Sequence, residues 1–357
     1  MKSLSLVCLI LISTIGGAIA TPISIEPRIV GGIQSLAGEL PWQLFLSVEK
    51  TDGWNYKCGA VYIGNRYALT AAHCVDGVKS DDSSQGQAIS VFAGSNDLRD
   101  FLPIDSAIEP SIAPIYVSKA NVTIHPDYNH STFDNDIAVL ELNQEPAALA
   151  IKLASAEERR AALNEFDLAY VPGGKSDENL IVSGWGLTHG QDVNSDSIHL
   201  LQTALTGVPL DICQDQWPFE LPKVICATMP DPDFIRDSCN GDSGGPLVWK
   251  NHQDANDGFG LRLLGLVGFG ASACNAMPPG GYTDIAMHTE FILDNTPNGL
   301  PESNSDFSAD PFTRSYQGTG VKAYDDKAQS GSFGGGVIVL LTIVSVFRRF
   351  RGFKKDG

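Results

Sequence analysis

The sequence has little positive charge for its length. Its 357 residues include 24 Lys and Arg against 42 Asp and Glu, which gives a formal net charge of −18. Contacts with the phosphates of a nucleic acid need clustered basic side chains, so this balance argues against nucleic-acid partners. It favours a soluble protein outside the cell whose partners are basic rather than acidic.

The chain also lacks C-x-x-C spacing and internal repeats. Without closely spaced cysteine pairs, no zinc site is expected. Cysteine itself is scarce, and one of the seven, Cys8, lies in an apolar stretch at the N-terminus. The other six form an even number, so we expect them to pair in an oxidising compartment, in any of fifteen connectivities.

The N-terminus has the order of features of an exported protein. Residues 1–20 have one positive charge near the start, at Lys2, followed by an apolar stretch at 4–15 and, at the end, the small residues "AIA". This order predicts a cleaved secretory signal peptide. The alternative, a first core helix, is disfavoured because Gly16 and Pro22 would interrupt it.

The body of the chain consists of short apolar segments such as "QLFLSV", "YALTAA" and "IAVLEL", separated by Gly, Pro, Asn and Asp. This pattern predicts an all-β sandwich or barrel. The stretch "SAEERRAALNEF" at 155–166 has a helical pattern, although it equally fits a surface insertion. Residues 298–333 are rich in Ser, Gly, Asp and Pro and poor in branched apolar residues, so we expect a disordered linker there.

Three short motifs carry candidate chemistry: "LTAAHC" at 69–74, "DNDIAVL" at 134–140 and "SCNGDSGGPLV" at 238–248. A serine hydroxyl is a poor nucleophile at neutral pH, and it needs a base within hydrogen-bond reach that a carboxylate holds in one tautomer. A Gly-Asp-Ser-Gly string alone fits a turn. Together with "RIVGG" and "SGWG", however, the three motifs resemble the chymotrypsin-like serine proteases, trypsin most of all.

The resemblance extends over about residues 29–295 and implies a protease domain at 29–297. The implied fold is two six-stranded antiparallel Greek-key β-barrels, with the active site in the cleft between them and a C-terminal helix after them. The implied activity is that of a serine endopeptidase without a cofactor. The acid of the calcium loop that trypsins carry would fall near Ser95, so no metal site is expected. Two rivals remain open: a catalytically inactive homologue that acts as a binding module, and an esterase or a protease with a different pocket preference.

The catalytic residues implied by the resemblance are His73, Asp136 and Ser243, in the chain order typical of this family. Asp134 is a competing acid, but the family motif places the acid directly before the apolar strand, which selects Asp136. The backbone N–H groups of Gly241 and Ser243 would stabilise the oxyanion of the tetrahedral intermediate.

The resemblance further implies a zymogen with a short pro-segment at 21–28. Cleavage after Arg28 would free the α-amino group of Ile29, which would pair with Asp242. A buried carboxylate without a partner is costly, so the uncut chain should not hold the oxyanion turn in place.

The implied substrate pocket has Asp237 at its floor, six residues before Ser243. A carboxylate there selects Arg or Lys before the scissile bond, and Gly270 and Gly280 would leave the walls open. Gly268 replaces the serine of the usual Ser-Trp-Gly string, so a hydroxyl near the catalytic acid is missing. The expected partners are protein or peptide substrates with Arg or Lys and serine protease inhibitors.

The resemblance also gives a pairing of the cysteines. It predicts three disulfides, each of which would stabilise the fold by roughly 2 to 4 kcal/mol: Cys58 with Cys74, Cys213 with Cys226, and Cys239 with Cys274.

The C-terminal segment 334–357 combines glycines, a short apolar run and five basic residues. The run at 334–347 has 14 residues, whereas a membrane span usually needs about 17 to 25, so we expect one short transmembrane helix with its basic end in the cytoplasm. The segment also resembles the GlyGly-CTERM sorting tails of Gram-negative bacterial exported proteins, which a rhomboid-type protease trims. Both interpretations place the protease at the cell surface or in the medium, and they differ in whether the anchor is permanent.

Overall fold

The structure is a computed structural model that describes residues 29–80, 88–104, 109–190, 192, 194–304, 306–317 and 319–322. The predicted signal peptide at 1–20, the pro-segment at 21–28 and the membrane tail at 334–357 lie outside these residues. Within the described part of the chain, no helix has the length and apolar character needed to cross a membrane.

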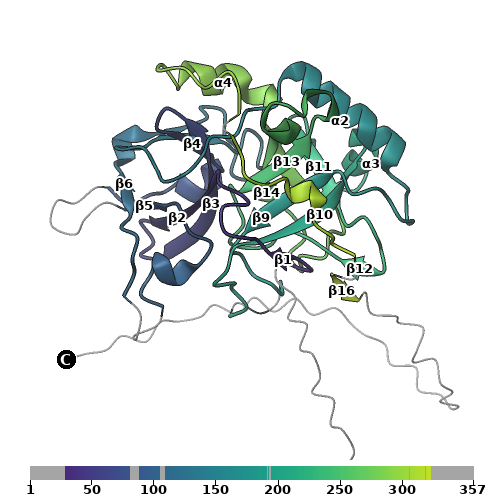
Figure 1. The fold of residues 1–357 in the computed structure, drawn as a ribbon, viewed down its shortest axis with the longest axis horizontal. Helices are drawn as coiled ribbons and strands as arrows, with labels where there is room; N and C mark the ends of the chain where they lie inside the picture. The colour runs from purple at the N-terminus through teal and green to yellow at the C-terminus, as the bar shows by residue number, and fades with distance from the viewer. Residues whose placement is uncertain are drawn as a thin grey trace, which may run out of the picture. The chain divides into compact units, whose positions relative to one another are not determined.

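The first half of the chain forms one antiparallel sheet, drawn in purple and blue in Figure 1. Its order is β6-β5-β2-β3-β4-β8-β7, with the bounds β2 (Gln43–Glu49), β3 (Asn55–Gly64), β4 (Tyr67–Thr70), β5 (Ile89–Phe92), β6 (Ile115–Val117), β7 (Val122–Ile124) and β8 (Ala138–Glu141). A short 3-10 helix at Lys119–Asn121 separates β6 from β7. Because β6 pairs with β5 and β7 with β8, this interrupted segment joins the two ends of the sheet into a barrel.

The second half forms another antiparallel sheet, of order β1-β10-β11-β15-β14-β13-β9, in which an extra pairing between β9 and β10 closes a ring. Its strands are β1 (Ile33–Gln34), β9 (Leu180–Gly184), β10 (Leu201–Val208), β11 (Val224–Thr228), β13 (Pro246–Lys250), β14 (Leu261–Phe269) and β15 (Gly280–Asp284). The prediction of two β-barrels is therefore confirmed in its architecture, but each sheet has seven strands instead of six. The extra strand comes from the break between β6 and β7 in one sheet and from β1 on the edge of β10 in the other.

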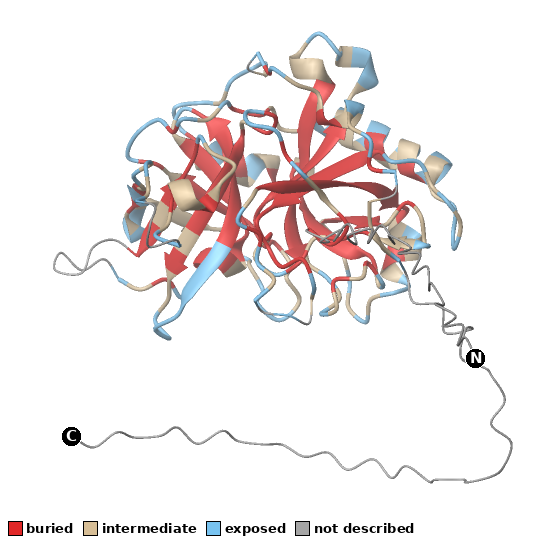
Figure 2. Ribbon diagram, turned by 60° about the horizontal axis from the view of Figure 1, so that its bottom comes forward, coloured by how far each residue is buried: buried red, intermediate tan, exposed pale blue. Residues whose placement is uncertain are grey.

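Buried side chains fill the strands of both sheets, as Figure 2 shows in red. Aromatic rings join the two halves: Phe45 of β2 meets Trp185, which follows β9, with ring centroids 5.7 Å apart in a T-shaped arrangement. Such pairs contribute about 0.5 to 1.5 kcal/mol beyond the burial of their area. The packing fixes one barrel against the other and with them the loops that carry the candidate site.

In the described part of the chain, four α-helices accompany the sheets: α1 (Ala72–Val75), α2 (Ala156–Ala169), α3 (Leu210–Gln214) and α4 (Thr289–Asp294). The helix predicted at 155–166 is confirmed as α2. Ser155 accepts a hydrogen bond from the N–H of Glu158, whose carboxylate accepts one from the N–H of Ser155, which is a capping box. The helix buries Phe166 over Gly207 of β10, where any Cβ would lie 2.3 Å from the ring.

The prediction of a disordered linker at 298–333 is wrong for its described residues, which continue the fold up to Lys322. We call residues 298–322 the C-terminal strap. Although its composition is that of a linker, two of its three aromatic side chains are buried: Phe307 lies 4.8 Å from Trp42 between ring centroids, and Tyr316 is 1% exposed. The described fold therefore continues to Lys322 and does not end at 297.

Polar contacts hold the strap at several points along its length. Asn304 donates from Nδ2 to the carbonyl oxygens of Asp257 and Leu261 at 3.0 and 2.8 Å. Arg314 pairs at 2.7 Å with Glu39, which is 2% exposed. The last described residues form β16 (Val321–Lys322), which pairs antiparallel with β12 (Phe234–Ile235). The strap thus reaches from α4 to the segment that precedes Asp237.

Candidate active site

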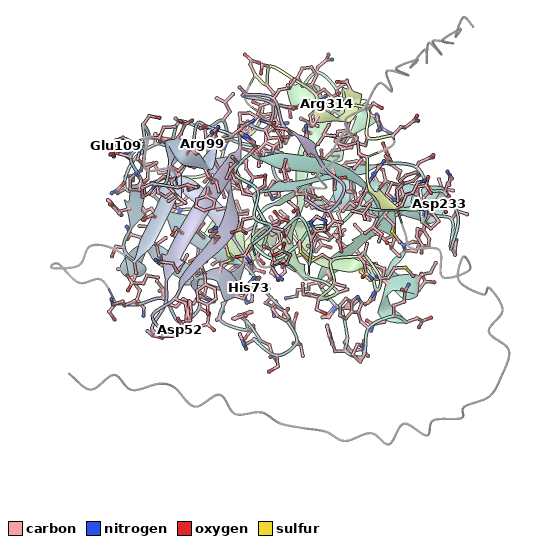
Figure 3. The ribbon with its side chains drawn as sticks, turned by 90° about the horizontal axis from the view of Figure 1, so that it is seen from below. Asp52, His73, Arg99, Glu109, Asp233 and Arg314 are labelled. Carbon is pink, nitrogen blue, oxygen red and sulfur yellow. A yellow bond between two sulfur atoms is a disulfide. The ribbon has the colours of Figure 1, made fainter. Side chains whose placement is uncertain are left out.

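His73 and Asp136 form the best-defined polar pair of the candidate site. His73 lies in α1, directly after β4, and Figure 3 shows it between the two sheets. Its Nδ1 lies 2.7 Å from Oδ2 of Asp136, and its backbone N–H donates to Oδ1 at 2.8 Å. Thr283 also donates from Oγ1 to the carbonyl oxygen of Asp136 at 2.9 Å. Asp136 is fully buried, so it holds the ring in one orientation and leaves Nε2 available for proton transfer.

The competing acid, Asp134, makes different contacts. Its carbonyl oxygen accepts a hydrogen bond from the N–H of Asn129 at 3.0 Å, and its own N–H donates to Oγ1 of Thr132 at 3.4 Å. The structure therefore brings Asp136 to His73, as the motif predicted, and leaves Asp134 in the preceding turn.

Ser243 lies in the tight turn before β13. The turn is tied to the first barrel by the N–H of Gly59, which donates to the carbonyl oxygen of Ser243 at 2.7 Å. Sγ of Cys74 lies 3.6 Å from that oxygen and 3.9 Å from Nε2 of His73, which places the serine beside the histidine. No hydrogen bond joins Ser243 Oγ to His73 among the described residues; in unliganded enzymes this contact is often long and tightens when substrate binds.

Gly241 gives the turn its shape. Its φ of +99° favours glycine, and a Cβ at this position would lie 2.9 Å from Cα of Gly186. Among the residues that the structure describes, nothing accepts a hydrogen bond from the N–H of Gly241 or of Ser243. Both donors are therefore free to bind an oxyanion.

Asp242 points away from Ser243 into the protein interior. Its carboxylate accepts hydrogen bonds from the N–H groups of Cys239 and Gly186, both at 2.8 Å. Burial raises the pKa of Asp242 to about 7, although the two backbone donors act in the opposite direction. No described Lys or Arg pairs with it, and Ile29 is fully buried. Arg28 lies outside the described residues.

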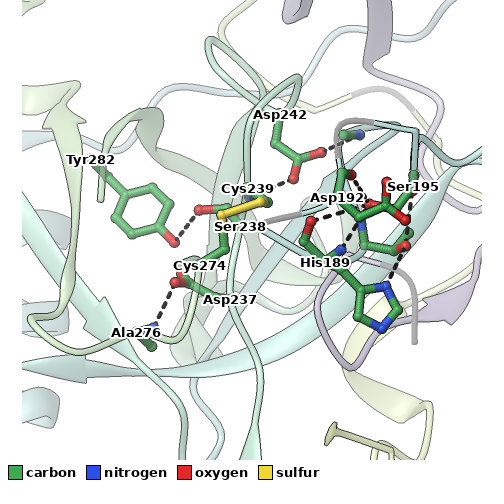
Figure 4. Close-up of a disulfide and its surroundings, with 12 residues drawn as sticks. His189, Asp192, Ser195, Asp237, Ser238, Cys239, Asp242, Cys274, Ala276 and Tyr282 are labelled. Atoms are coloured by element: carbon green, nitrogen blue, oxygen red, sulfur yellow. Dashed lines mark hydrogen bonds between the residues drawn. A yellow bond between two sulfur atoms is a disulfide. The ribbon is translucent and has the colours of Figure 1, made fainter. Parts of the chain in front are cut away.

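Asp237 is the second buried carboxylate of the region and follows β12. Its Oδ2 accepts a 2.7 Å hydrogen bond from the N–H of Ala276, and Figure 4 shows this contact next to the Cys239–Cys274 disulfide. The side chain is 2% exposed, and burial raises its pKa to about 7. Ser238 Oγ and the Tyr282 hydroxyl lie 3.1 Å apart beside it. Such a carboxylate gains strongly from a cationic partner.

The three glycines predicted around this carboxylate lie on β14 and β15 or just after them. A Cβ at Gly270 would come no closer than 4.0 Å to Cα of Gly280, so the two glycines face each other. A Cβ at Gly268 would lie 3.8 Å from Oδ2 of Asp136. A serine hydroxyl at position 268 would therefore lie close to the carboxylate of Asp136.

All three predicted disulfides are confirmed. Cys58 bonds to Cys74 beside His73, Cys239 bonds to Cys274 beside Asp237, and Cys213 of α3 bonds to Cys226 of β11. The first bond joins β3 to α1, the helix that carries His73. The second joins the residues after Asp237 to the loop that contains Ala276.

An aromatic cluster next to His73 was missed by the sequence reasoning. The ring of Phe133 lies 5.6 Å from that of His73 and 5.6 Å from that of Phe269, and Trp217 meets Phe269 edge-on at 5.0 Å. Phe133, Trp217 and Phe269 come from three segments that are far apart in the sequence, so no local periodicity indicates that they meet. The only available signal was the large residue at position 269 between two glycines.

Comparisons with known proteins agree with this geometry. The family model described as Trypsin matches residues 29–292. Trypsin-1 of Astacus astacus is 31% identical over 75% of this chain and 99% of its own length. The CLIP domain-containing serine protease HP8 of Bombyx mori is 32% identical over 74% of this chain and 69% of its own length.

Two further matches are partial or distant. Transmembrane protease serine 9 of Rattus norvegicus is 30% identical over 74% of this chain. The matched region is only 22% of the length of the rat protein. A solved structure of HL collagenase has a TM-score of 0.56 at 24% identity, covers 75% of this chain and 98% of that one, and supports the fold alone. The family match extends over most of the chain and coincides with both barrels, so the protein belongs to the trypsin family and is a serine endopeptidase.

Proposed function

We propose that the protein hydrolyses peptide bonds after Arg or Lys. The observation that carries this specificity is Asp237, a buried carboxylate that pairs with no Lys or Arg among the residues that the structure describes. Gly270 and Gly280, the glycines expected at the pocket walls, face each other. A guanidinium or ammonium group that reaches Asp237 would compensate the cost of its charge, and a neutral side chain would not. Physiological substrates are therefore proteins or peptides with accessible Arg or Lys.

The proposed chemistry follows from the contacts of the other site residues. Ser243 Oγ attacks the scissile carbonyl, and His73 Nε2 takes its proton while Asp136 holds the ring. The N–H groups of Gly241 and Ser243 bind the oxyanion, and each such donor typically lowers the barrier by about 3 to 4 kcal/mol. His73 then donates its proton to the leaving amine, and water hydrolyses the acyl-enzyme by the same route.

The chain is proposed to be a zymogen that is activated by cleavage after Arg28. The family match begins at Ile29, and Ile29 is itself fully buried. A new α-amino group at Ile29 would supply the cation that the buried carboxylate of Asp242 lacks. Because this pairing fixes the residue next to Ser243, cleavage would also fix the oxyanion turn.

Export and anchoring remain part of the proposal. Residues 1–20 would direct secretion, and residues 334–357 would hold the protease at the outer side of a membrane, either permanently or until a rhomboid-type protease trims a GlyGly-CTERM tail. Serine protease inhibitors are expected partners of the exported enzyme. Mass spectrometry of the mature protein would report both ends at once, and a mature chain that keeps Arg348 would contradict trimming.

Covalent labelling tests the chemistry most simply. An organophosphate such as diisopropyl fluorophosphate should modify the activated chain once, at Ser243, and should leave the Ser243→Ala variant unmodified. A folded chain that is cleaved after Arg28 and takes no label would instead be a binding module.

A further inference from the structure

The last residues of the C-terminal strap lie against the segment that carries Asp237. We call residues 234–237 the Asp237 segment. Ile235 pairs with Val321 and Phe234 with Lys322, in the antiparallel ladder of β12 with β16. At the other end of the segment, the N–H of Asp237 donates to the carbonyl oxygen of Val30 at 3.1 Å. Among the described residues, β16 is the only strand that pairs with β12.

Arg236, the neighbour of Asp237, is the main polar link to the strap. Its side chain is buried, and its guanidinium donates to the carbonyl oxygens of Tyr316 and Thr319, in the latter case at 3.4 Å. The third contact is an ion pair with Glu178 at 2.5 Å. If the strap were displaced, a buried guanidinium would lose two acceptors, which is costly.

An apolar contact and a close backbone approach complete the link. Val321 packs on the small cluster that contains Val30 and the Cys239–Cys274 disulfide. A Cβ at Gly31 would lie 2.6 Å from Cα of Gly320, so the two backbones touch. The strap therefore contacts the disulfide next to Asp237 and the residues that follow Ile29 as well as the Asp237 segment itself.

We propose that Arg236 and Val321 are positioning residues for the substrate pocket: through them the strap holds the Asp237 segment, so binding of a basic side chain depends on a part of the chain that follows the last helix of the second barrel. The reason is local. The two-residue strand β12 is too short to keep its own geometry, and β16 supplies the missing ladder. The inference rests on the proposed role of Asp237 in binding Arg or Lys.

The test compares point variants of the full-length chain after cleavage at Arg28. Val321→Asp places a charge against the apolar cluster. Arg236→Gln replaces the guanidinium with a shorter, neutral amide and so removes the charge-assisted hydrogen bonds to the strap. Val321→Thr is the matched conservative variant. Arg314→Ala loosens the strap at Glu39, an ion pair that includes no residue of the Asp237 segment. Figure 3 shows Arg314 and His73 at opposite sides of the domain.

The readouts are the inhibition constant of benzamidine, KM and kcat for an arginine anilide, and Tm. Val321→Asp and Arg236→Gln should raise the inhibition constant and KM at least tenfold, with kcat changed less than threefold. Val321→Thr should stay within twofold of the wild type. Arg314→Ala should lower Tm and leave the inhibition constant within twofold.

Two results would overturn the inference: wild-type affinity for benzamidine in both Val321→Asp and Arg236→Gln, or an equal loss of affinity in Arg314→Ala. If the wild type does not bind benzamidine, the proposed specificity for Arg and Lys is wrong, but the proposed role of the strap is not yet contradicted. KM is then measured with a substrate that has the wild type's preferred residue before the scissile bond. The expected result is still a KM at least tenfold above the wild-type value in Val321→Asp and Arg236→Gln.

Discussion

Gly268 faces the carboxylate of Asp136: a Cβ at position 268 would lie 3.8 Å from Asp136 Oδ2 and 3.7 Å from Oγ1 of Thr283. A serine at this position would bring its hydroxyl within reach of the carboxylate. The catalytic acid of this chain therefore lacks a hydrogen-bond donor that one substitution would supply.

Gly268→Ser should improve on Gly268→Ala, its matched control. Both variants introduce a Cβ at 3.1 Å from the carbonyl oxygen of Gly281, so both require the same small shift of the strand. Only serine adds a hydrogen bond to a charged group, which stabilises by about 1.5 to 3 kcal/mol at most. We expect kcat/KM of the serine variant to exceed that of the alanine variant by roughly three- to tenfold. Equal values would show that the hydroxyl does not reach Asp136.

Asp237 should make the free protein less stable as the pH rises. Its carboxyl has an ordinary pKa of 3.8 and a pKa of about 7 in the fold, because of burial. Between these values the unfolded chain has released the proton while the folded chain retains it, so a rise in pH favours unfolding. The Tm of Asp237→Asn should equal that of the wild type near pH 4 and exceed it at pH 8. Comparing the two proteins removes most of the contribution of Asp242, whose charge is the smallest of the causes that shift the pKa of Asp237.

Benzamidine binding should show the opposite pH dependence. The cation binds the ionised carboxylate of Asp237, so affinity should increase from pH 5 to pH 8 in the wild type. Asp237→Asn should bind at least tenfold more weakly, with no such increase. A pH-independent affinity in the wild type would place the cation elsewhere.

Activation is predicted to be autocatalytic, because Arg28 has the side chain that the proposed pocket accepts. The Ser243→Ala protein, purified alone, should stay uncut after Arg28, whereas the wild type should acquire Ile29 as its N-terminus. N-terminal sequencing distinguishes the two. Maturation of Ser243→Ala without an added protease would contradict self-activation.

The Cys239–Cys274 disulfide should matter for binding as well as for stability. Replacing both cysteines with alanine should lower the free energy of unfolding by about 2 to 4 kcal/mol and weaken benzamidine binding, because the bond joins Asp237 to the Ala276 loop. The Cys213–Cys226 pair is the control: its loss should lower stability and leave affinity unchanged. Equal affinities in both double variants would contradict a role of Cys239 in the pocket.

The sequence predicted the candidate site better than it predicted the fold around it. The residues of the site stand in three short motifs whose chemistry needs those residue types together, so His73 and Asp136 were assigned to each other before any geometry was known. The three disulfides followed from the same resemblance. These predictions rest on local strings, and local strings are what a sequence shows directly.

The strap could not be predicted because its stability comes from partners elsewhere in the chain. Its composition is that of a linker, yet Phe307 packs on Trp42 and Arg314 pairs with Glu39. No local sequence pattern indicates that Trp42 or Glu39 would contact this segment. The importance of Arg236 is hidden for the same reason, because its acceptors are backbone carbonyl groups of the strap.

The most direct test of the account is a comparison of kcat/KM for peptide substrates that differ only in the residue before the scissile bond: Arg, Lys, Phe and Ala. The account predicts that the activated wild type prefers Arg and Lys at least a hundredfold over Phe and Ala, and that Asp237→Ser abolishes this preference. A wild type that prefers Phe, or an Asp237→Ser variant that keeps its preference for Arg, would contradict it.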